Sequence, residues 1–201
     1  SEKCRSQIWT GKTAILEAVG ADALEFLHRL STQDLRGLLA EDAASTTTAF
    51  TTAQGKLVEW CRIYRASAEE FLLLCHEAKG EALREWIDKY IIIEDVEVRD
   101  ISGQFLHLEV GLDAPELGEA ITTTALKVMP PAGRLLKNEW LVPQANVDAL
   151  KSIEMGDEAS REWLRVLAGE PSPHLEYQKE TNALELNLLH DAIGWNKGCY
   201  I

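Results

Sequence analysis

Apolar and polar residues alternate along much of the first half of this chain, and the alternation predicts a series of β-strands. Two stretches instead repeat their apolar residues every three or four positions, the spacing of an amphipathic helix. The predicted strands cover residues 15–19, 46–52, 56–64, 70–75, 91–98 and 105–110, and the predicted helices cover 22–30 and 79–90. Strands and helices therefore interleave as β-α-β-β-α-β, the split arrangement of ferredoxin-like units.

Both predicted helices gather their apolar residues on one face, which we expect to pack against a sheet. The face of the first helix consists of Leu24, Phe26, Leu27 and Leu30, and that of the second consists of Leu83, Trp86, Ile87 and Tyr90.

The pattern weakens between residues 115 and 131, where Pro130-Pro131 marks a loop. Three elements are predicted beyond it: a strand at 135–142, a helix at 146–155 capped by Asn146, and a helix that Asp157-Glu158 opens, that carries Trp163, Leu164 and Leu167, and that stops at Gly169. The predicted class is α+β, with residues 1–125 as an N-terminal ferredoxin-like subdomain and 126–201 as a second α+β subdomain.

Composition and charge narrow the classes of partner. The 201 residues carry a formal net charge of −13, and such a surface repels phosphate backbones, so direct non-specific binding of nucleic acid is not expected. No apolar stretch has the length of a membrane span, and the N-terminus lacks the apolar core of a signal peptide. We expect a monomer in the cytoplasm, or in the mitochondrial matrix or a plastid if the source is eukaryotic.

The cysteines are widely spaced and form no C-x-x-C pair, which argues against a disulfide scaffold and a self-contained zinc site. Cys61 and Cys75 lie in apolar strand patterns and are interpreted as buried thiols. Cys199 differs, because Lys197 favours its thiolate and Gly198 leaves room for a ligand. On spacing alone, a chain end without a chemical role is the more economical interpretation of Cys199.

Other polar residues give weaker signals. Gln54-Gly55-Lys56 is either an anion-binding turn or, more simply, a hairpin connection. His28 and His107 lie in apolar patterns and are interpreted as hydrogen-bonded core or rim groups. The tryptophans are assigned to the core by default, and Trp195 is the one we consider for stacking on a ligand.

Several motifs occur in a fixed order along the chain. They are G-A-D-A-x-x-F-L at 20–27, L-S-T-Q-D at 30–34, F-T-T-A-Q-G-K at 50–56, R-V-L-A-G-E-P at 165–171, L-E-L-N-L at 184–188 and I-G-W-N-K-G-C-Y-I at 193–201. Together they resemble the YgfZ branch of the GcvT-like folate-binding family, whose signature is K-G-C-Y-x-G-Q-E. The last motif is the most specific of the six.

The chain departs from that family in two respects. It stops at Ile201, before G-Q-E, so we expect the family's C-terminal barrel to be absent. Glycine-cleavage aminomethyltransferases have the motif G-G-x-x-D-D, and this chain has Glu59 and Trp60 at the positions of its two Asp residues. They also have the motif R-L-E-A-G, and Leu167 occupies the position of its Glu. Tryptophan can neither take up nor hold a proton, so aminomethyl transfer is disfavoured.

The resemblance implies a GcvT-like fold and a tetrahydrofolate-binding accessory protein that supports iron–sulfur cluster assembly or repair, including for tRNA-modifying enzymes. Its partners are then folate and an iron–sulfur carrier or cluster-dependent enzyme. It assigns Cys199 as the functional thiol and as ligand of a transient cluster shared with a partner. The folate-binding positions it implies are Asp34, Gln54, Gly55, Arg165, Gly169, Glu185, Lys197, Gly198 and Tyr200.

Two alternatives remain at this stage. One is a folate-dependent aminomethyltransferase or demethylase, for which Glu59 and Asp34 are the surviving carboxylates. The other is a scaffold with a vestigial pocket. The accessory role, without catalytic turnover of its own, is the preferred prediction.

Overall fold

The structure is a computed structural model that describes residues 6–39, 45–128, 136–173, 175–178, 180–186, 188 and 192–198. It divides into two compact units, each built from two stretches of chain. Unit 1 consists of Ser1–Lys12 and Ser102–Glu170, and unit 2 consists of Thr13–Ile101 and Pro171–Ile201. These units do not follow the predicted boundary after residue 125, which stays a prediction about subdomains.

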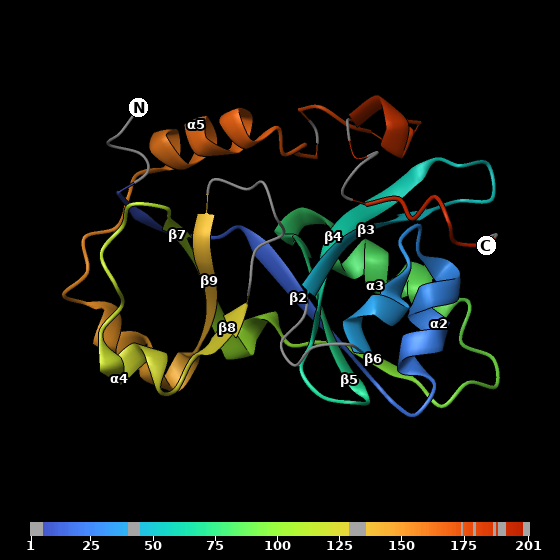
Figure 1. Cartoon of the computed structure of the whole chain (residues 1–201), viewed down its shortest axis with the longest axis horizontal. Helices are drawn as coiled ribbons and strands as arrows, with labels where there is room; N and C mark the ends of the chain where they lie inside the picture. Colours follow the sequence, from blue (N-terminus) through green and yellow to red (C-terminus); the bar gives the residue numbers. More distant parts are fainter. Residues whose placement is uncertain are drawn as a thin grey trace. The chain divides into compact units, whose positions relative to one another are not determined.

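Unit 2 is built on a five-stranded antiparallel sheet in the order β3-β4-β5-β2-β6 (Figure 1). Its strands are β2 (Thr13–Val19), β3 (Ser45–Thr51), β4 (Leu57–Arg65), β5 (Glu70–His76) and β6 (Glu97–Asp100). Its helices are α2 (Ala23–Leu30) and α3 (Gly80–Asp88), with short 3₁₀ turns η1 (Leu35–Leu39), η2 (Glu77–Lys79) and η5 (Ala183–Leu186). The predicted alternation of strands and helices is present, including the three strands predicted between the two helices.

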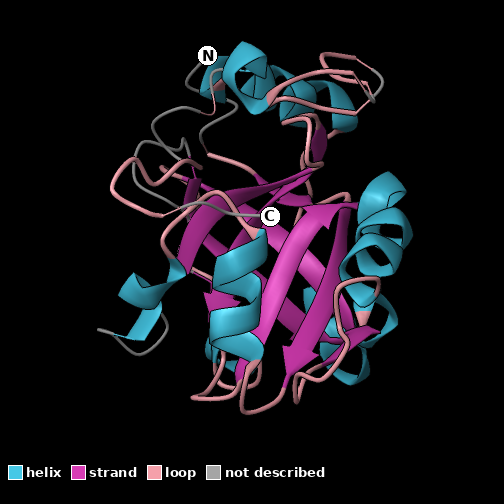
Figure 2. Ribbon diagram, turned by 90° about the vertical axis from the view of Figure 1, so that its right-hand side faces the viewer, coloured by secondary structure: helices cyan, strands magenta, loops and turns pink. Residues whose placement is uncertain are grey.

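The two helices cover one face of this sheet through the apolar positions that the sequence indicated (Figure 2). Phe26, Leu27 and Leu30 of α2 are buried, as are Leu83 and Ile87 of α3. Each such side chain contributes about 1.5–3 kcal/mol by leaving water, so these faces hold the helices to the sheet.

The cysteines and aromatic side chains of unit 2 mostly follow their predictions. Cys61 and Cys75 are free and buried in the core. Trp86 packs on Phe50, with ring centroids 5.9 Å apart. Trp195, by contrast, is exposed.

The predicted strand at 91–98 is wrong over residues 91–96. Pairing with β2 begins at Glu97, and residues 92–95 form a bend. The backbone N–H groups of Ile92 and Ile93 donate to the Glu94 carboxylate instead of to a neighbouring strand. The sequence pattern could not reveal this local competition for the backbone donors.

Unit 1 contains a four-stranded antiparallel sheet in the order β1-β7-β9-β8. Its strands are β1 (Ile8–Thr10), β7 (Phe105–Gly111), β8 (Leu126–Val128) and β9 (Leu136–Pro143), and its helical segments are η3 (Ser102–Gln104), α4 (Glu119–Thr122), η4 (Gln144–Leu150) and α5 (Glu158–Ala168). Within the described ranges both sheets of the chain are open. The predicted strands at 105–110 and 135–142 are therefore confirmed as β7 and β9.

Two predictions in unit 1 need correction. The helix expected at 146–155 is the 3₁₀ turn η4, and Asn146 lies inside it, not at its cap. Met155 instead bridges to Ile8 of β1, which holds that part of the chain in an extended conformation. This bridge to the edge of the sheet thus overrides the weak helical signal of the segment.

Helix α5 begins and ends where the sequence indicated. The Asp157 side chain accepts the Ser160 N–H at 2.8 Å, and Gly169 closes the helix in the left-handed conformation. The assignment of Trp163 to the core is wrong: Leu164 is buried, whereas Trp163 and Leu167 are 52% and 53% exposed.

Unit 1 also holds a buried network of polar and ionisable side chains. His107 lies 3.3 Å from Glu139, and Arg161 makes a two-pronged contact with Glu109 at 2.9 and 2.7 Å. Glu109 and Glu139 are paired across β7 and β9. His107 is thus a hydrogen-bonded core group, as predicted.

Within the described residues, no helix is both long enough and apolar enough to cross a membrane.

Candidate functional site

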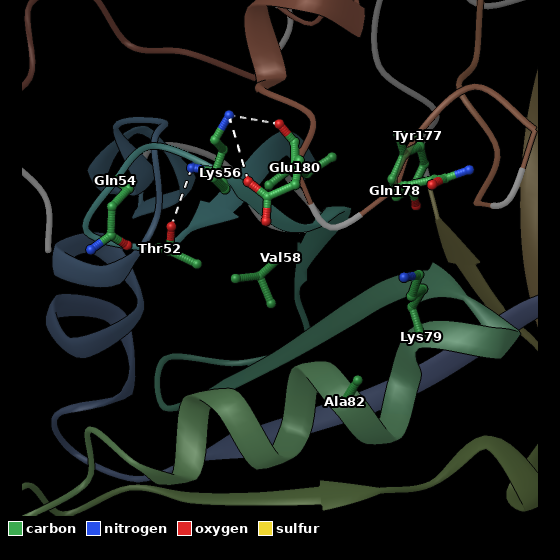
Figure 3. A pocket seen from close by; sticks show the side chains of 10 residues that line it. Thr52, Gln54, Lys56, Val58, Lys79, Ala82, Tyr177, Gln178 and Glu180 are labelled. Carbon is green, nitrogen blue, oxygen red and sulfur yellow. Dashed lines mark hydrogen bonds and ion pairs between the residues drawn. The ribbon is translucent and has the colours of Figure 1, made fainter.

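Unit 2 contains a cavity of about 590 Å³ where the β3–β4 turn, the start of α3 and the loop around residue 178 meet (Figure 3). This volume is in the range of small-molecule sites. The cavity is lined by Thr52, Gln54, Lys56, Leu57, Val58, Lys79, Ala82, Tyr177, Gln178 and Glu180. We call it the turn pocket.

A tight turn places Gln54 and Lys56 at the cavity wall. Thr52 and Lys56 are joined by a backbone hydrogen bond of 2.8 Å, and the Gly55 N–H donates to the Thr52 carbonyl at 2.8 Å. Gly55 has a φ of +75°, a conformation that side chains rarely adopt. The predicted turn is therefore confirmed, and two of its three residues line a cavity.

Two ammonium groups and one carboxylate, that of Glu180, line the turn pocket. The Lys56 ammonium donates to the Glu180 carbonyl at 2.7 Å and lies 4.0 Å from the Glu180 carboxylate. Lys79 extends from the start of α3 toward Tyr177 (Figure 3), and its ammonium lies 5.8 Å from the ring centroid. With Leu57, Val58 and Ala82 supplying apolar surface, the cavity suits a flat ligand with an anionic group.

A buried carboxyl group lies behind the Tyr177 wall. Glu59 is 1% exposed, and one of its oxygens accepts the Tyr177 hydroxyl at 2.7 Å. Its other oxygen has no hydrogen-bond partner in the described part of the chain. Burial raises the pKa of Glu59 to about 7, although the Tyr177 hydrogen bond and the Lys79 charge both act to lower it. The group is thus poised to exchange a proton near neutral pH.

The implied folate positions fall into separate places. Gln54 lines the turn pocket, and Gly55 forms its turn. Glu185 is nearby: its carboxylate accepts from Asn182 at 3.0 Å, and Asn182 pairs with Lys56 in a β-bridge.

Lys197 has a structural role at the end of α2. Its ammonium donates to the backbone carbonyls of His28, Ser31 and Gln33, the last at 3.2 Å. The His28 and Ser31 carbonyls lie at the end of α2, where a helix leaves carbonyls without intrahelical donors, and the Lys197 ammonium satisfies them. Burial lowers the pKa of Lys197 to about 8, so it remains a cation at neutral pH. Gly198 follows it on the exposed surface.

Asp34 lies in the same neighbourhood. Its carboxylate accepts two hydrogen bonds from the Arg36 guanidinium, at 2.9 and 2.6 Å, and lies 3.5 Å from the His28 ring. The hydrogen bonds from Arg36 are the main cause of a pKa well below the usual value for Asp34. Asp34 is thus held by Arg36, and Lys197 by backbone carbonyls, so the positions of both side chains are accounted for without a bound ligand.

Arg165 and Gly169 belong to α5 of unit 1. Arg165 is buried, and its guanidinium donates to the Glu162 carboxylate at 2.8 and 2.7 Å and to the Glu170 carbonyl. Gly169 serves as the left-handed end of the helix. Both residues therefore fix how α5 ends.

The remaining predicted site residues, Cys199 and Tyr200, lie outside the described residues. The roles assigned to them, including the shared cluster, stay predictions. Within the described part of the chain, no three His, Cys, Asp or Glu side chains group so as to hold a metal ion.

Sequence reasoning missed Lys79 and Tyr177. Lys79 was placed at the start of a predicted helix whose apolar face drew attention, and Tyr177 lies in a segment without periodicity. Neither has a local motif, and their proximity exists only in the folded unit.

The fold places the chain in a known structural class. It superimposes on the crystal structure of the glycine cleavage system aminomethyltransferase T from Bartonella henselae with a TM-score of 0.73, at 14% identity, covering 90% of this chain and 56% of that protein. The chain therefore has a GcvT-like fold.

Sequence relatives agree with this fold class. An uncharacterized protein from Haemophilus influenzae is 28% identical over 192 residues, which is 93% of this chain and 62% of that protein. A provisionally named chloroplastic transferase of Arabidopsis thaliana is 26% identical over 90% of this chain and 47% of its own length. An aminomethyltransferase from Halalkalibacterium halodurans is 31% identical over 46% of this chain and 25% of its length. No protein-family model matches the chain.

Proposed function

We propose that this chain binds tetrahydrofolate within a GcvT-like fold and supports the assembly or repair of iron–sulfur clusters, among them clusters of tRNA-modifying enzymes. The observation that carries the folate part is the turn pocket, a cavity with two lysines and an aromatic wall in a fold shared with an aminomethyltransferase.

The chemistry of the turn pocket fits a folate. A folate combines a flat ring system with carboxylates at its far end. The apolar wall of Leu57, Val58 and Ala82 suits the ring system or its linker, and Lys56 and Lys79 suit the carboxylates. Gln54 supplies an amide that both donates and accepts hydrogen bonds.

The folate proposal is tested by calorimetry on the protein with tetrahydrofolate. We expect Lys56→Gln with Lys79→Gln to weaken binding at least tenfold, because both ammonium groups are lost. Lys89→Gln is the matched control, since Lys89 is an exposed lysine of unit 2 that does not line the cavity. Equal affinity of wild type and the double variant would show that tetrahydrofolate does not bind in the turn pocket.

Ligand protection against heat gives an independent readout. A ligand that binds the native state selectively raises its unfolding temperature. We expect tetrahydrofolate to protect wild type and the Lys89→Gln control, but not the double variant.

The cluster part of the proposal rests on Cys199. One thiolate cannot hold a cluster, so a partner must supply the other ligands. The protein, mixed with a purified cluster carrier, is expected to develop the visible absorption of a shared cluster, and Cys199→Ser is expected to abolish it. If both proteins give the same spectrum, the cysteine has no such role.

Folate-dependent one-carbon transfer is the second candidate, and Glu59 favours it. A carboxyl group with a pKa of about 7, linked through Tyr177 to the pocket, suits general acid–base catalysis near neutral pH. An assay of tetrahydrofolate-dependent methylene transfer separates the candidates: turnover that Glu59→Gln abolishes would support transfer, and its absence in wild type supports the accessory role.

A further inference from the structure

The turn pocket has a buried carboxyl group behind its aromatic wall, one that the proposed folate contacts do not use. Tyr177 lines the cavity, and its hydroxyl donates to one Glu59 oxygen at 2.7 Å. The other Glu59 oxygen has no hydrogen-bond partner in the described residues, and Glu59 as a whole is 1% exposed. The carboxyl group is therefore bonded to the cavity wall but sealed from water.

Lys79 connects this carboxyl group to the cavity electrostatically. Its side chain lines the pocket, and its ammonium lies 5.8 Å from the Tyr177 ring centroid (Figure 3). Burial raises the pKa of Glu59, and the charge of Lys79 acts to lower it. The ammonium that stabilises ionised Glu59 is thus also a group that would hold a ligand carboxylate. Charges in such a buried setting interact more strongly than in water.

The other ionisable groups close to Glu59 keep their protonation state near neutral pH. Burial raises the pKa of the Cys61 and Cys75 thiols, on β4 and β5, and the Glu59 charge raises both further. Burial also raises the pKa of the Tyr177 hydroxyl. These three groups are neutral in the physiological range. Among the described residues that act on the Glu59 carboxyl group, Lys79 is therefore the one that supplies a charge.

We infer that anion binding in the turn pocket is coupled to protonation of Glu59. A ligand carboxylate that binds Lys79 offsets the charge that stabilises ionised Glu59, and it brings a second negative charge close by. Glu59 then takes up one proton from solvent, and the proton is released when the ligand leaves. This coupling rests on the proposed folate site, and it makes Glu59 a positioning residue that acts through Lys79 and Tyr177.

The coupling fixes the sign of the pH dependence. Glu59 has a pKa of about 7 in the free protein, and a bound anion raises it further. Below pH 7 the carboxyl group already holds its proton, so binding carries no extra cost. Above pH 7 the ligand must draw a proton from solution, and affinity falls. One like-charge pair across the tyrosine corresponds to a loss of about tenfold by pH 9.

Calorimetry with tetrahydrofolate from pH 6 to pH 9, at constant ionic strength, tests the coupling. Carboxylates of the ligand stay ionised over this range, so they do not contribute to the change. We expect the affinity of wild type to fall by about tenfold across it. Titrations at pH 7.5 in two buffers of different ionisation enthalpy, such as Tris and HEPES, should show uptake of about half a proton per bound ligand.

Two variants assign the proton to Glu59. Glu59→Gln keeps an oxygen for the Tyr177 hydroxyl but cannot ionise, so the ratio of wild-type to variant affinity should fall by about tenfold from pH 6 to pH 9. Lys197, whose pKa is about 8, also titrates here, and the ratio removes its contribution. Tyr177→Phe removes a hydrogen bond that lowers the Glu59 pKa, so its affinity should begin to fall at a higher pH.

The possible results separate the coupling from the folate site. If tetrahydrofolate binds wild type and Glu59→Gln with the same pH dependence, the coupling is wrong and the folate site stands. Proton uptake that Glu59→Gln retains would assign the proton to another group and would also overturn the coupling. If wild type binds no tetrahydrofolate at any pH, both the coupling and the folate site are wrong.

Discussion

Glu59→Gln should change how the stability of the protein depends on pH. Glu59 has a pKa of about 7 in the folded chain, against an ordinary value of 4.5, because burial disfavours its charge. The folded state therefore holds a proton between these values that the unfolded state has released. The unfolding free energy therefore decreases as the pH rises from 4.5 to about 7, and this contribution stays constant above pH 7.

The size of the effect follows from the two pKa values. The rise in the Glu59 pKa from 4.5 to about 7 corresponds to ~3 kcal/mol of unfolding free energy, since each pKa unit is worth about 1.4 kcal/mol. Glutamine keeps an oxygen to accept the Tyr177 hydroxyl and has no charge. We therefore expect the variant to match wild type near pH 4.5 and to exceed it by ~3 kcal/mol above pH 7.

The assay is urea unfolding at half-unit steps from pH 4.5 to 8, followed by circular dichroism and tryptophan fluorescence. Taking the difference between the two proteins removes all other titrating groups. A difference that stays flat, or that favours wild type at high pH, would refute the reasoning. Tyr177→Phe provides a control. The Tyr177 hydroxyl lowers the pKa of Glu59, so without it the pH-dependent loss of stability should extend to higher pH.

Three further outcomes are expected from the same structure. Lys197→Met removes the ammonium that donates to the His28, Ser31 and Gln33 carbonyls and should lower the unfolding free energy by about 2–4 kcal/mol in urea titrations. Arg161→Met leaves the buried Glu109 charge unpaired and should cost about 3–5 kcal/mol, much of which Glu109→Gln in the same chain should restore. Burial raises the pKa of both Cys61 and Cys75, so iodoacetamide should modify them only after unfolding, as mass spectrometry of the labelled peptides can show.

Much of the fold was accessible from local pattern. The apolar faces of α2 and α3, the turn at Gly55 and the boundaries of α5 follow from periodicity, a left-handed glycine and capping residues. Errors arose where the backbone found a competing partner. At Ile92 and Ile93 the Glu94 carboxylate took the donors that a strand needs, and at Met155 a bridge to β1 took precedence over a helix.

The candidate site was predicted less completely. Gln54 was named, and it lines the turn pocket, because the turn that presents it is encoded within a few residues. Lys79 and Tyr177 could not be named, since nothing in their own neighbourhoods distinguishes them. Lys197 carried a motif, but its described contacts are with the end of α2.

The sequence by itself determined the α+β class, most of the elements, the buried thiols and the resemblance to GcvT-like proteins, because these depend on periodicity and short motifs. Tertiary structure alone decided that two lysines and a tyrosine share a cavity, that Glu59 loses its solvent and gains a raised pKa, and that two isoleucines are held out into water. Those properties depend on distance and burial in the folded chain, which residues far apart in sequence acquire only by packing together.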